Sequence, residues 1–160
     1  STELKYKWFD LSIALQGVQG NKIANIFRRY IDNMEGGNNC QVDALDRWQP
    51  ESNPGSGYVV RANRSATGMN GTTSTWHIED GSYMRIREIT LGYTLPKHLL
   101  KRMGISNLRI YGSAFNPFTF TKYSGYNPEV STNSSPIMQG VDYGTYPLSK
   151  SFVVGINFSL

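Results

Sequence analysis

The chain has 160 residues, of which 39% are hydrophobic and only 18% are charged, and its formal net charge is +4. The charged share lies below the roughly one quarter that is typical of soluble domains. Aromatic residues make up 12%, which is too many for a disordered chain. The basic residues form no cluster that could follow a phosphate backbone, so no nucleic-acid partner is expected. Cys40 is the single cysteine, which excludes an internal disulfide and a cysteine-rich zinc site.

The first periodic stretch, residues 6–17, predicts a β-strand with one apolar and one polar face. Apolar and polar residues alternate along it, as they do along a strand whose two faces meet different surroundings. Four apolar side chains fall on one face: Phe9, Leu11, Ile13 and Leu15. The polar residues of the stretch fall on the other face, among them Asp10, Ser12 and Gln16.

Residues 18–81 are interpreted as one long loop that contains a short helix. Between Asn21 and Met34 the apolar residues recur at spacings of three and four, which predicts an amphipathic helix. Gly36 and Gly37 are expected to end it. The following stretch, 48–75, is rich in Pro, Gly, Ser, Asn and Thr, which is typical of loops. Loops of this length are usually functional or mobile.

Two further strands are predicted at 83–95 and 107–120. In the first, the apolar alternation changes phase before Ile89, which indicates a β-bulge near Arg87. In the second, Pro117 favours either a bulge or the end of the strand. The connection 96–106 starts with a proline and contains Gly104, so it is expected to form one or two helical turns.

A second long polar loop, 121–149, precedes the last strand, 150–160, whose alternation is the clearest in the chain. Four strands are thus separated by a long, a short and a long connection, which is the pattern of transmembrane β-barrels. The expected fold is all-β, with four antiparallel transmembrane strands. A periplasmic C-terminus would place 96–106 in the periplasm and both 18–81 and 121–149 outside the cell.

Four segments carry a resemblance to a known family. In chain order they are 46–51 (DRWQPE), 80–96 (DGSYMRIREITLGYTLP), 107–129 (beginning NLRIY) and 140–147 (GVDYGTYP). Together they resemble the SusC/RagA-type TonB-dependent transporters, in collinear order and over essentially the whole chain.

The resemblance implies that residues 1–160 are the C-terminal part of a barrel of about 22 strands with a plug in its lumen. Such transporters import glycans or peptides across the Bacteroidetes outer membrane. Their implied partners are a SusD-like surface lipoprotein, the TonB complex through the N-terminal part that is missing here, an oligosaccharide or peptide substrate, and outer-membrane lipid. Neither an enzymatic activity nor a cofactor is implied.

The end of the chain resembles the signal that barrel-assembly machinery recognises. The resemblance rests on Val153, Gly155, Phe158 and Leu160. The last residue of such barrels is typically Phe, so Leu160 departs from the pattern and is expected to weaken recognition.

No constellation of residues predicts catalysis or a metal site. His77 near Glu79 is interpreted as a loop histidine, since a catalytic site needs several groups together. Seven loop residues are candidates for contact with ligand or partner: Arg28, Arg29, Trp48, Tyr58, Trp76, Tyr126 and Tyr143. Aromatic rings stack on sugars and also pack loops against each other, so both interpretations stay open here.

Two alternatives to an importer segment also stay open at this point. One is a soluble β-rich glycan-binding module, against which the apolar final strand argues. The other is a trimeric anchor in which each chain contributes four strands to one barrel, against which the long loop 18–81 argues.

Overall fold

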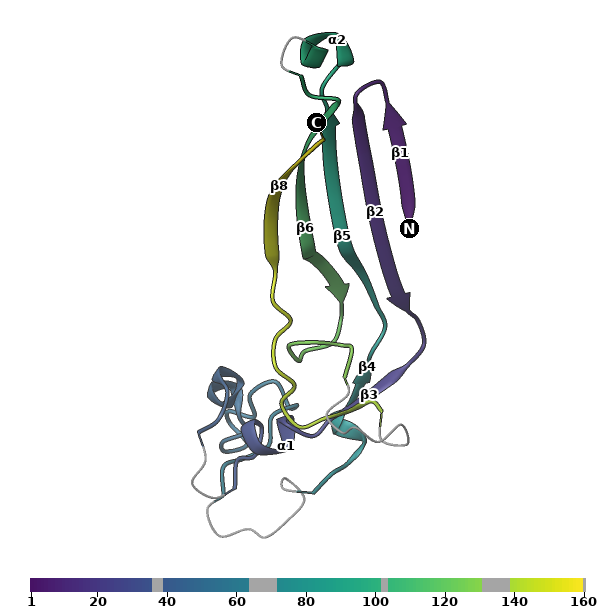
Figure 1. The fold of residues 1–160 in the computed structure, drawn as a ribbon. Helices are drawn as coiled ribbons and strands as arrows, with labels where there is room; N and C mark the ends of the chain where they lie inside the picture. The colour runs from purple at the N-terminus through teal and green to yellow at the C-terminus, as the bar shows by residue number, and fades with distance from the viewer. Residues whose placement is uncertain (36–38, 64–71, 102–103, 131–138, 160) are drawn as a thin grey trace. The chain divides into compact units, whose positions relative to one another are not determined.

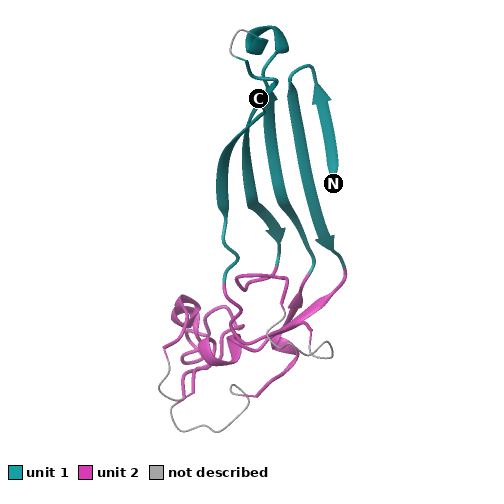
Figure 2. Ribbon diagram, in the orientation of Figure 1, with its two compact units in different colours: residues 1–19, 82–122, 147–160 teal, residues 20–81, 123–146 magenta. Residues whose placement is uncertain are grey.

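The computed structural model describes residues 1–35, 39–63, 72–101, 104–130 and 139–159. The chain divides into two compact units, coloured teal and magenta in Figure 2. The first comprises residues 1–19, 82–122 and 147–160, and the second comprises residues 20–81 and 123–146. Among the described residues, no helix has both the length and the apolar character needed to cross a membrane.

The first unit is an antiparallel sheet with the strand order β1-β2-β5-β6-β8 (Figure 1). Its strands are β1 (Thr2–Tyr6), β2 (Phe9–Val18), β5 (Tyr83–Thr94), β6 (Asn107–Thr121) and β8 (Ser151–Ser159). The all-β prediction is confirmed.

The predicted count of four strands is wrong, because the sheet has five. The additional strand is β1, which pairs with β2 from Thr2↔Ile13 to Tyr6↔Phe9. The two are joined by Lys7 and Trp8, and Lys7 takes a φ of 54°. A positive φ at the first position of a two-residue turn suits a tight hairpin, but Gly usually marks such turns and is absent here.

The sheet has one apolar and one polar face. Side chains of residues paired across neighbouring strands point to the same side, and the pairing rows Phe9–Tyr93–Ile110–Ile156 and Leu11–Leu91–Gly112–Val154 therefore share a face. Most of its large side chains are exposed, including Leu4, Tyr6, Phe9, Leu15, Met84, Leu91, Ile110, Phe118, Phe120, Phe152, Val154, Ile156 and Phe158.

Two β-bulges keep this apolar face continuous. The register between β2 and β5 shifts between Ala14 and Leu15, which leaves Arg87 as an extra residue on β5. The register between β5 and β6 shifts at the same level, where Asn116 and Pro117 on β6 lie opposite the single residue Arg87 on β5. Asn116 takes a φ of 49° there. The bulge predicted near Arg87 is confirmed. Pro117 marks a bulge and not the end of its strand, since β6 continues to Thr121.

The connection between β5 and β6 contains one helical turn, α2 (Lys97–Leu100), which follows Pro96. Gly104 takes a φ of +69° after it, a conformation that glycine adopts without strain. A helical turn was expected in this connection.

The second unit contains a small sheet with the order β4-β3-β7, formed by β3 (Lys22–Asn25), β4 (Ile78–Asp80) and β7 (Val141–Asp142). The helical elements among its described residues are α1 (Arg28–Ile31) and the 3-10 turns η1 (Val42–Asp46) and η3 (Thr75–His77). The amphipathic helix predicted over 21–34 is therefore reduced to the four residues of α1. Ile23 and Asn25 are buried on alternate positions of β3, so period-two burial replaces the helical period there.

Candidate functional site

Two carboxylates hold the second unit together. Glu79 on β4 accepts hydrogen bonds from Asn25 Nδ2 at 3.1 Å, from Ser124 N at 2.8 Å and from Arg28 Nη1 at 3.2 Å. It thereby connects β3, α1 and the start of the loop that follows β6. The strand β7 pairs with β3 in parallel, so segments from both long loops meet in one small sheet.

Asp142 on β7 is the second of these carboxylates and lies deeper, with 3% of the residue exposed. Its Oδ2 accepts the Tyr123 hydroxyl at 2.6 Å, while its Oδ1 accepts the backbone N–H groups of Gly144 at 2.8 Å and Thr145 at 2.7 Å. The contacts tie the two ends of the segment 123–146 to each other.

Burial and hydrogen bonding act in opposite directions on these carboxylates. Burial raises the pKa of both Glu79 and Asp142, but the donors around each favour the charged form more strongly, so both pKa values lie below the ordinary range. Burial and the bond to Asp142 together raise the pKa of Tyr123. All three groups therefore keep their charge states at neutral pH.

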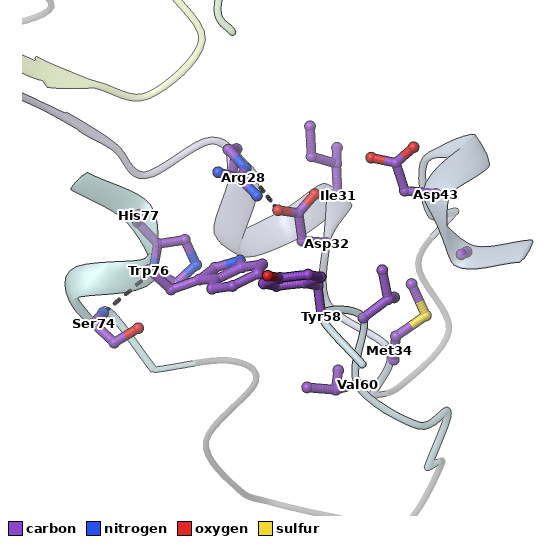
Figure 3. A pocket seen from close by; sticks show the side chains of 12 residues that line it. Arg28, Ile31, Asp32, Met34, Asp43, Tyr58, Val60, Ser74, Trp76 and His77 are labelled. Atoms are coloured by element: carbon purple, nitrogen blue, oxygen red, sulfur yellow. Dashed lines mark hydrogen bonds and ion pairs between the residues drawn. The ribbon is translucent and has the colours of Figure 1, made fainter. Parts of the chain in front are cut away.

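A cavity of about 260 Å³ lies in the second unit, beside α1 and η3 (Figure 3). Trp76 and Tyr58 line it with their rings, and 49% of Trp76 and 74% of Tyr58 are exposed. Arg28 and Asp32 lie next to the rings in Figure 3 and form an ion pair of 2.7 Å across one turn of α1. The Arg28 guanidinium also lies 5.6 Å from the Trp76 ring centroid, within cation–π range.

His77 lines the same cavity although only 4% of the residue is exposed. Its Nδ1 accepts the backbone N–H of Ser74 at 3.2 Å, drawn as a dashed line in Figure 3. A neutral imidazole that accepts at Nδ1 carries its proton on Nε2. No hydrogen bond joins Nε2 to any residue that the structure describes, so this donor is available to a ligand.

Two further hollows adjoin the cavity. One of about 390 Å³ shares Tyr58 and Val60 with it and is also lined by Trp48. The other, of about 140 Å³, shares Arg28 and is also lined by Tyr126 and Asn25. Asn25 is 3% exposed, and its amide oxygen has no hydrogen-bond partner among the described residues.

The structure brings together some of the predicted contact residues but not all. Arg28, Tyr58 and Trp76 line one cavity, and Trp48 and Tyr126 line the hollows beside it. None of these three spaces is lined by Arg29 or Tyr143.

Sequence reasoning missed Asp32 and the role of His77 in the cavity. The four-residue spacing of Asp32 from Arg28 was a usable signal, because it allows an ion pair on one helix face. The Ser74-Thr75-Trp76-His77 order was a second signal, since a side chain at the third helical position can bond back to the residue that caps the helix.

The polar face of the first unit carries a separate network of hydrogen bonds between strands. Arg109 on β6 reaches across β5 to Asp10 on β2, with 3.0 Å between Arg109 Nε and Asp10 Oδ1. Gly92 makes this possible, because a Cβ there would lie 2.5 Å from both side chains. Nearby, the hydroxyls of Thr90 and Ser113 share a hydrogen bond of 2.6 Å.

The residues of the suggested assembly signal fall on both faces of β8. Gly155 pairs with Tyr111, whose ring occupies the space that a Cβ at Gly155 would need. Val153 shares that face, whereas Phe158 lies on the apolar face opposite Leu108. Leu160 lies outside the described residues.

In the segments that the structure describes, no three His, Cys, Asp or Glu side chains are grouped so that they could hold a metal ion.

Comparisons by sequence and by structure both find known proteins that are similar to the chain over nearly its whole length. No protein-family model matches the chain. It is 30% identical over 162 residues to TonB-dependent receptor P3 of Formosa agariphila, which covers 98% of the chain and 15% of the relative. It is 27% identical over 159 residues to TonB-dependent receptor SusC of Bacteroides thetaiotaomicron, covering 98% of the chain and 14% of the relative. The RagAB peptide transporter matches it with a TM-score of 0.79 and 26% identity, over 96% of the chain and 16% of that structure.

The chain belongs to the SusC/RagA-type TonB-dependent receptors. The family resemblance predicted from the sequence is thereby confirmed. The structure of the RagAB peptide importer in its open-open state also matches, with a TM-score of 0.73 and 28% identity over 97% of the chain. The relatives of this SusC-like chain are named as TonB-dependent receptors or as a peptide transporter, and the chain spans only 14–16% of the length of each.

Proposed function

We propose that the chain is a wall segment of the outer-membrane barrel of a SusC-like importer. The observation that carries the proposal is the five-stranded sheet with an exposed apolar face and a polar face of cross-strand hydrogen bonds. A continuous apolar face that the protein itself leaves uncovered indicates a surface that contacts another apolar phase. In a barrel that phase is lipid, and the polar face lines the interior.

The distribution of aromatic residues along the strands supports this orientation. Phe9 and Tyr93 pack with 4.8 Å between their ring centroids at one end of the apolar face, and Phe118 and Phe120 stack at 6.5 Å at the other. Ile86, which pairs with Phe118, and Tyr93 are separated by seven residues on β5. At roughly 3.3 Å per residue this is about 23 Å, close to the apolar band of roughly 25 Å between the aromatic girdles of such barrels.

The topology within the envelope follows from the direction of the strands. With β8 ending in the periplasm, the connection that contains α2 is periplasmic, and residues 18–81 and 121–149 are extracellular. In the parent protein, a barrel of about 22 strands, β8 closes the wall against the first strand. Val153, Gly155, Phe158 and Leu160 act there as the assembly signal.

The proposed transport function belongs to the whole importer, of which this chain is the C-terminal part. The importer takes up glycans or peptides with a SusD-like surface lipoprotein over its extracellular loops. The TonB complex drives it through the N-terminal part. Arg29 and Tyr143, which lie in the loops outside the three hollows, are candidates for contact with the lipoprotein.

The test uses the full-length reading frame in its native host. Genomic sequence upstream of residue 1 is expected to encode a plug domain and the rest of the barrel. The protein is expected in the outer-membrane fraction, extractable only with detergent, and to migrate faster on gels before heating than after. Deletion of the gene should abolish uptake of one glycan or peptide class. Recovery of a soluble monomer would refute the proposal in favour of the binding-module alternative, and a four-strand trimer would favour the anchor.

A further inference from the structure

We propose that the cavity lined by Trp76, Tyr58 and His77 is a carbohydrate subsite that holds one neutral sugar ring. This inference rests on the proposed function and deepens it, since it places part of the glycan recognition within the transporter chain itself. Among the described residues, those that line the cavity all belong to the second unit, so each contact named here comes from the transporter chain itself.

The apolar part of the cavity matches the face of a sugar ring. Trp76 and Tyr58 are large and flat, and both are exposed. Figure 3 shows their rings in line along the cavity. Val60 and Met34 add to the apolar lining. Exposed aromatic rings that do not pack into a core provide a rigid surface for the C–H groups of a ligand, at a low cost in conformational entropy.

The polar part of the cavity offers both donors and acceptors. His77 presents its Nε2–H without a partner among the described residues, although the side chain is almost entirely buried. The Arg28–Asp32 pair lies beside the rings, and the Asp43 carboxylate lines the same space. Ligand pockets typically combine such an apolar lining with a few placed polar groups.

The same groups disfavour three other kinds of ligand. A purely apolar side chain would cover the His77 donor without bonding it, and an unsatisfied buried donor is costly. A cationic side chain would meet Arg28, which already occupies cation–π range of Trp76. An anion would meet Asp32 and Asp43. A polyhydroxylated, uncharged ring avoids all three conflicts, because its hydroxyls donate and accept while its C–H face packs on the rings.

The neighbouring hollow indicates that the sugar belongs to an oligosaccharide. Tyr58 and Val60 line both spaces, and Trp48 lies in the second. A sugar chain that leaves the first subsite over Tyr58 therefore reaches another aromatic residue.

The experiment measures binding to the full-length transporter, purified in detergent without its lipoprotein partner. Tryptophan fluorescence and calorimetry follow titration with neutral gluco-, manno-, xylo- and fructo-oligosaccharides of six units, and with neutral hexapeptides. At least one oligosaccharide is expected to bind. Trp76→Ala and Tyr58→Ala should each weaken that binding by about tenfold or more. Trp76→Phe, which keeps a ring, should retain most of it.

Tyr146→Ala is the matched control, because Tyr146 is exposed like Tyr58 and lines none of the three hollows. It should bind as the unmodified transporter does. Heat-modifiable migration of every variant shows whether the barrel is assembled. Assembled protein that binds no oligosaccharide, that binds peptides through Trp76 and Tyr58, or whose binding ignores both substitutions overturns the subsite while leaving the importer proposal intact. Protein that is not an outer-membrane barrel overturns both.

Discussion

The ion pair that crosses β5 leads to a prediction about Gly92. Replacing Gly92 with Ala places a Cβ 2.5 Å from Arg109 Nη2 and from both carboxylate oxygens of Asp10. The two side chains cannot keep their contact around this atom, so Gly92→Ala should separate them. Gly112 on the next strand is the matched control, because the nearest atom to a Cβ there is 4.0 Å away.

The expected cost follows from the geometry of the pair. The side chains of Arg109 and Asp10 are only 26% and 18% exposed, so solvent screens their contact incompletely. A hydrogen bond to a charged group contributes about 1.5–3 kcal/mol to the free energy of unfolding. Partial exposure of this pair lowers its contribution to about 1–2 kcal/mol. Alanine in a strand gains roughly 0.5–1 kcal/mol over glycine. Gly92→Ala should therefore destabilise the barrel, while Gly112→Ala should leave it unchanged or slightly stabilised.

The assay is the urea concentration at which the full-length barrel loses its heat-modifiable migration. Gly92→Ala should lower this midpoint and Gly112→Ala should not. Combined with Asp10→Ala, the Gly92 substitution should cost little more than Asp10→Ala alone, because both remove the same interaction. Equal midpoints for the two glycine variants, or additive losses in the double variant, would refute the reasoning.

Three other predictions concern the faces, the topology and the loops. Leu11→Arg puts a charge on the lipid-facing side and should cost about 2–4 kcal/mol near the midplane, whereas Ser12→Arg, on the polar face, should be milder. Equal loss of assembled protein from both would refute the assignment of the two faces. Cys40 is exposed, so a membrane-impermeant maleimide should label it on intact cells expressing the parent. Labelling only after lysis would contradict the topology. Asp142→Asn should weaken the bonds from Tyr123 and the loop backbone by about 2 kcal/mol and accelerate hydrogen exchange over residues 139–146, while the exposed Glu51→Gln should not. Because the pKa of Asp142 is lowered in the folded loop, its contribution to stability is present above the unfolded pKa and is lost as pH falls through the folded pKa. Protection of this segment, measured as the intrinsic exchange rate divided by the observed rate, should therefore also decrease below about pH 4.

The strands of the first unit could be predicted because their environment is imposed from outside the chain. A sheet between an apolar and a polar phase needs an apolar side chain at every second position, and β8 has one at each such position from Phe152 to Phe158. The bulge at Arg87 was visible as a change of phase for the same reason. β1 escaped prediction since it is five residues long and its turn uses Lys7 where a glycine is usual.

The loops were less predictable because contacts between distant segments determine them. Ile23 and Ile26 suggested a helix, but pairing of β3 with β4 and β7 imposes a strand on the first of them. That pairing joins residues more than fifty positions apart in the sequence, and no local sequence pattern predicts it. The cavity has the same origin, because Tyr58 and Trp76 meet Arg28 only after the loop has folded.

The parallel pairing of β3 with β7 has a consequence for exchanging loops between related transporters. Residues 20–81 and 123–146 form one compact unit, and Ala24 N donates to Gly140 O at 2.8 Å within it. A chimera that receives only one of the two segments would juxtapose a foreign β3 with the host β7. It would also separate Glu79 from the Ser124 hydroxyl, which donates to it at 2.8 Å from the other segment. Substrate specificity that resides in these loops can be transferred between such proteins only when both segments are exchanged together.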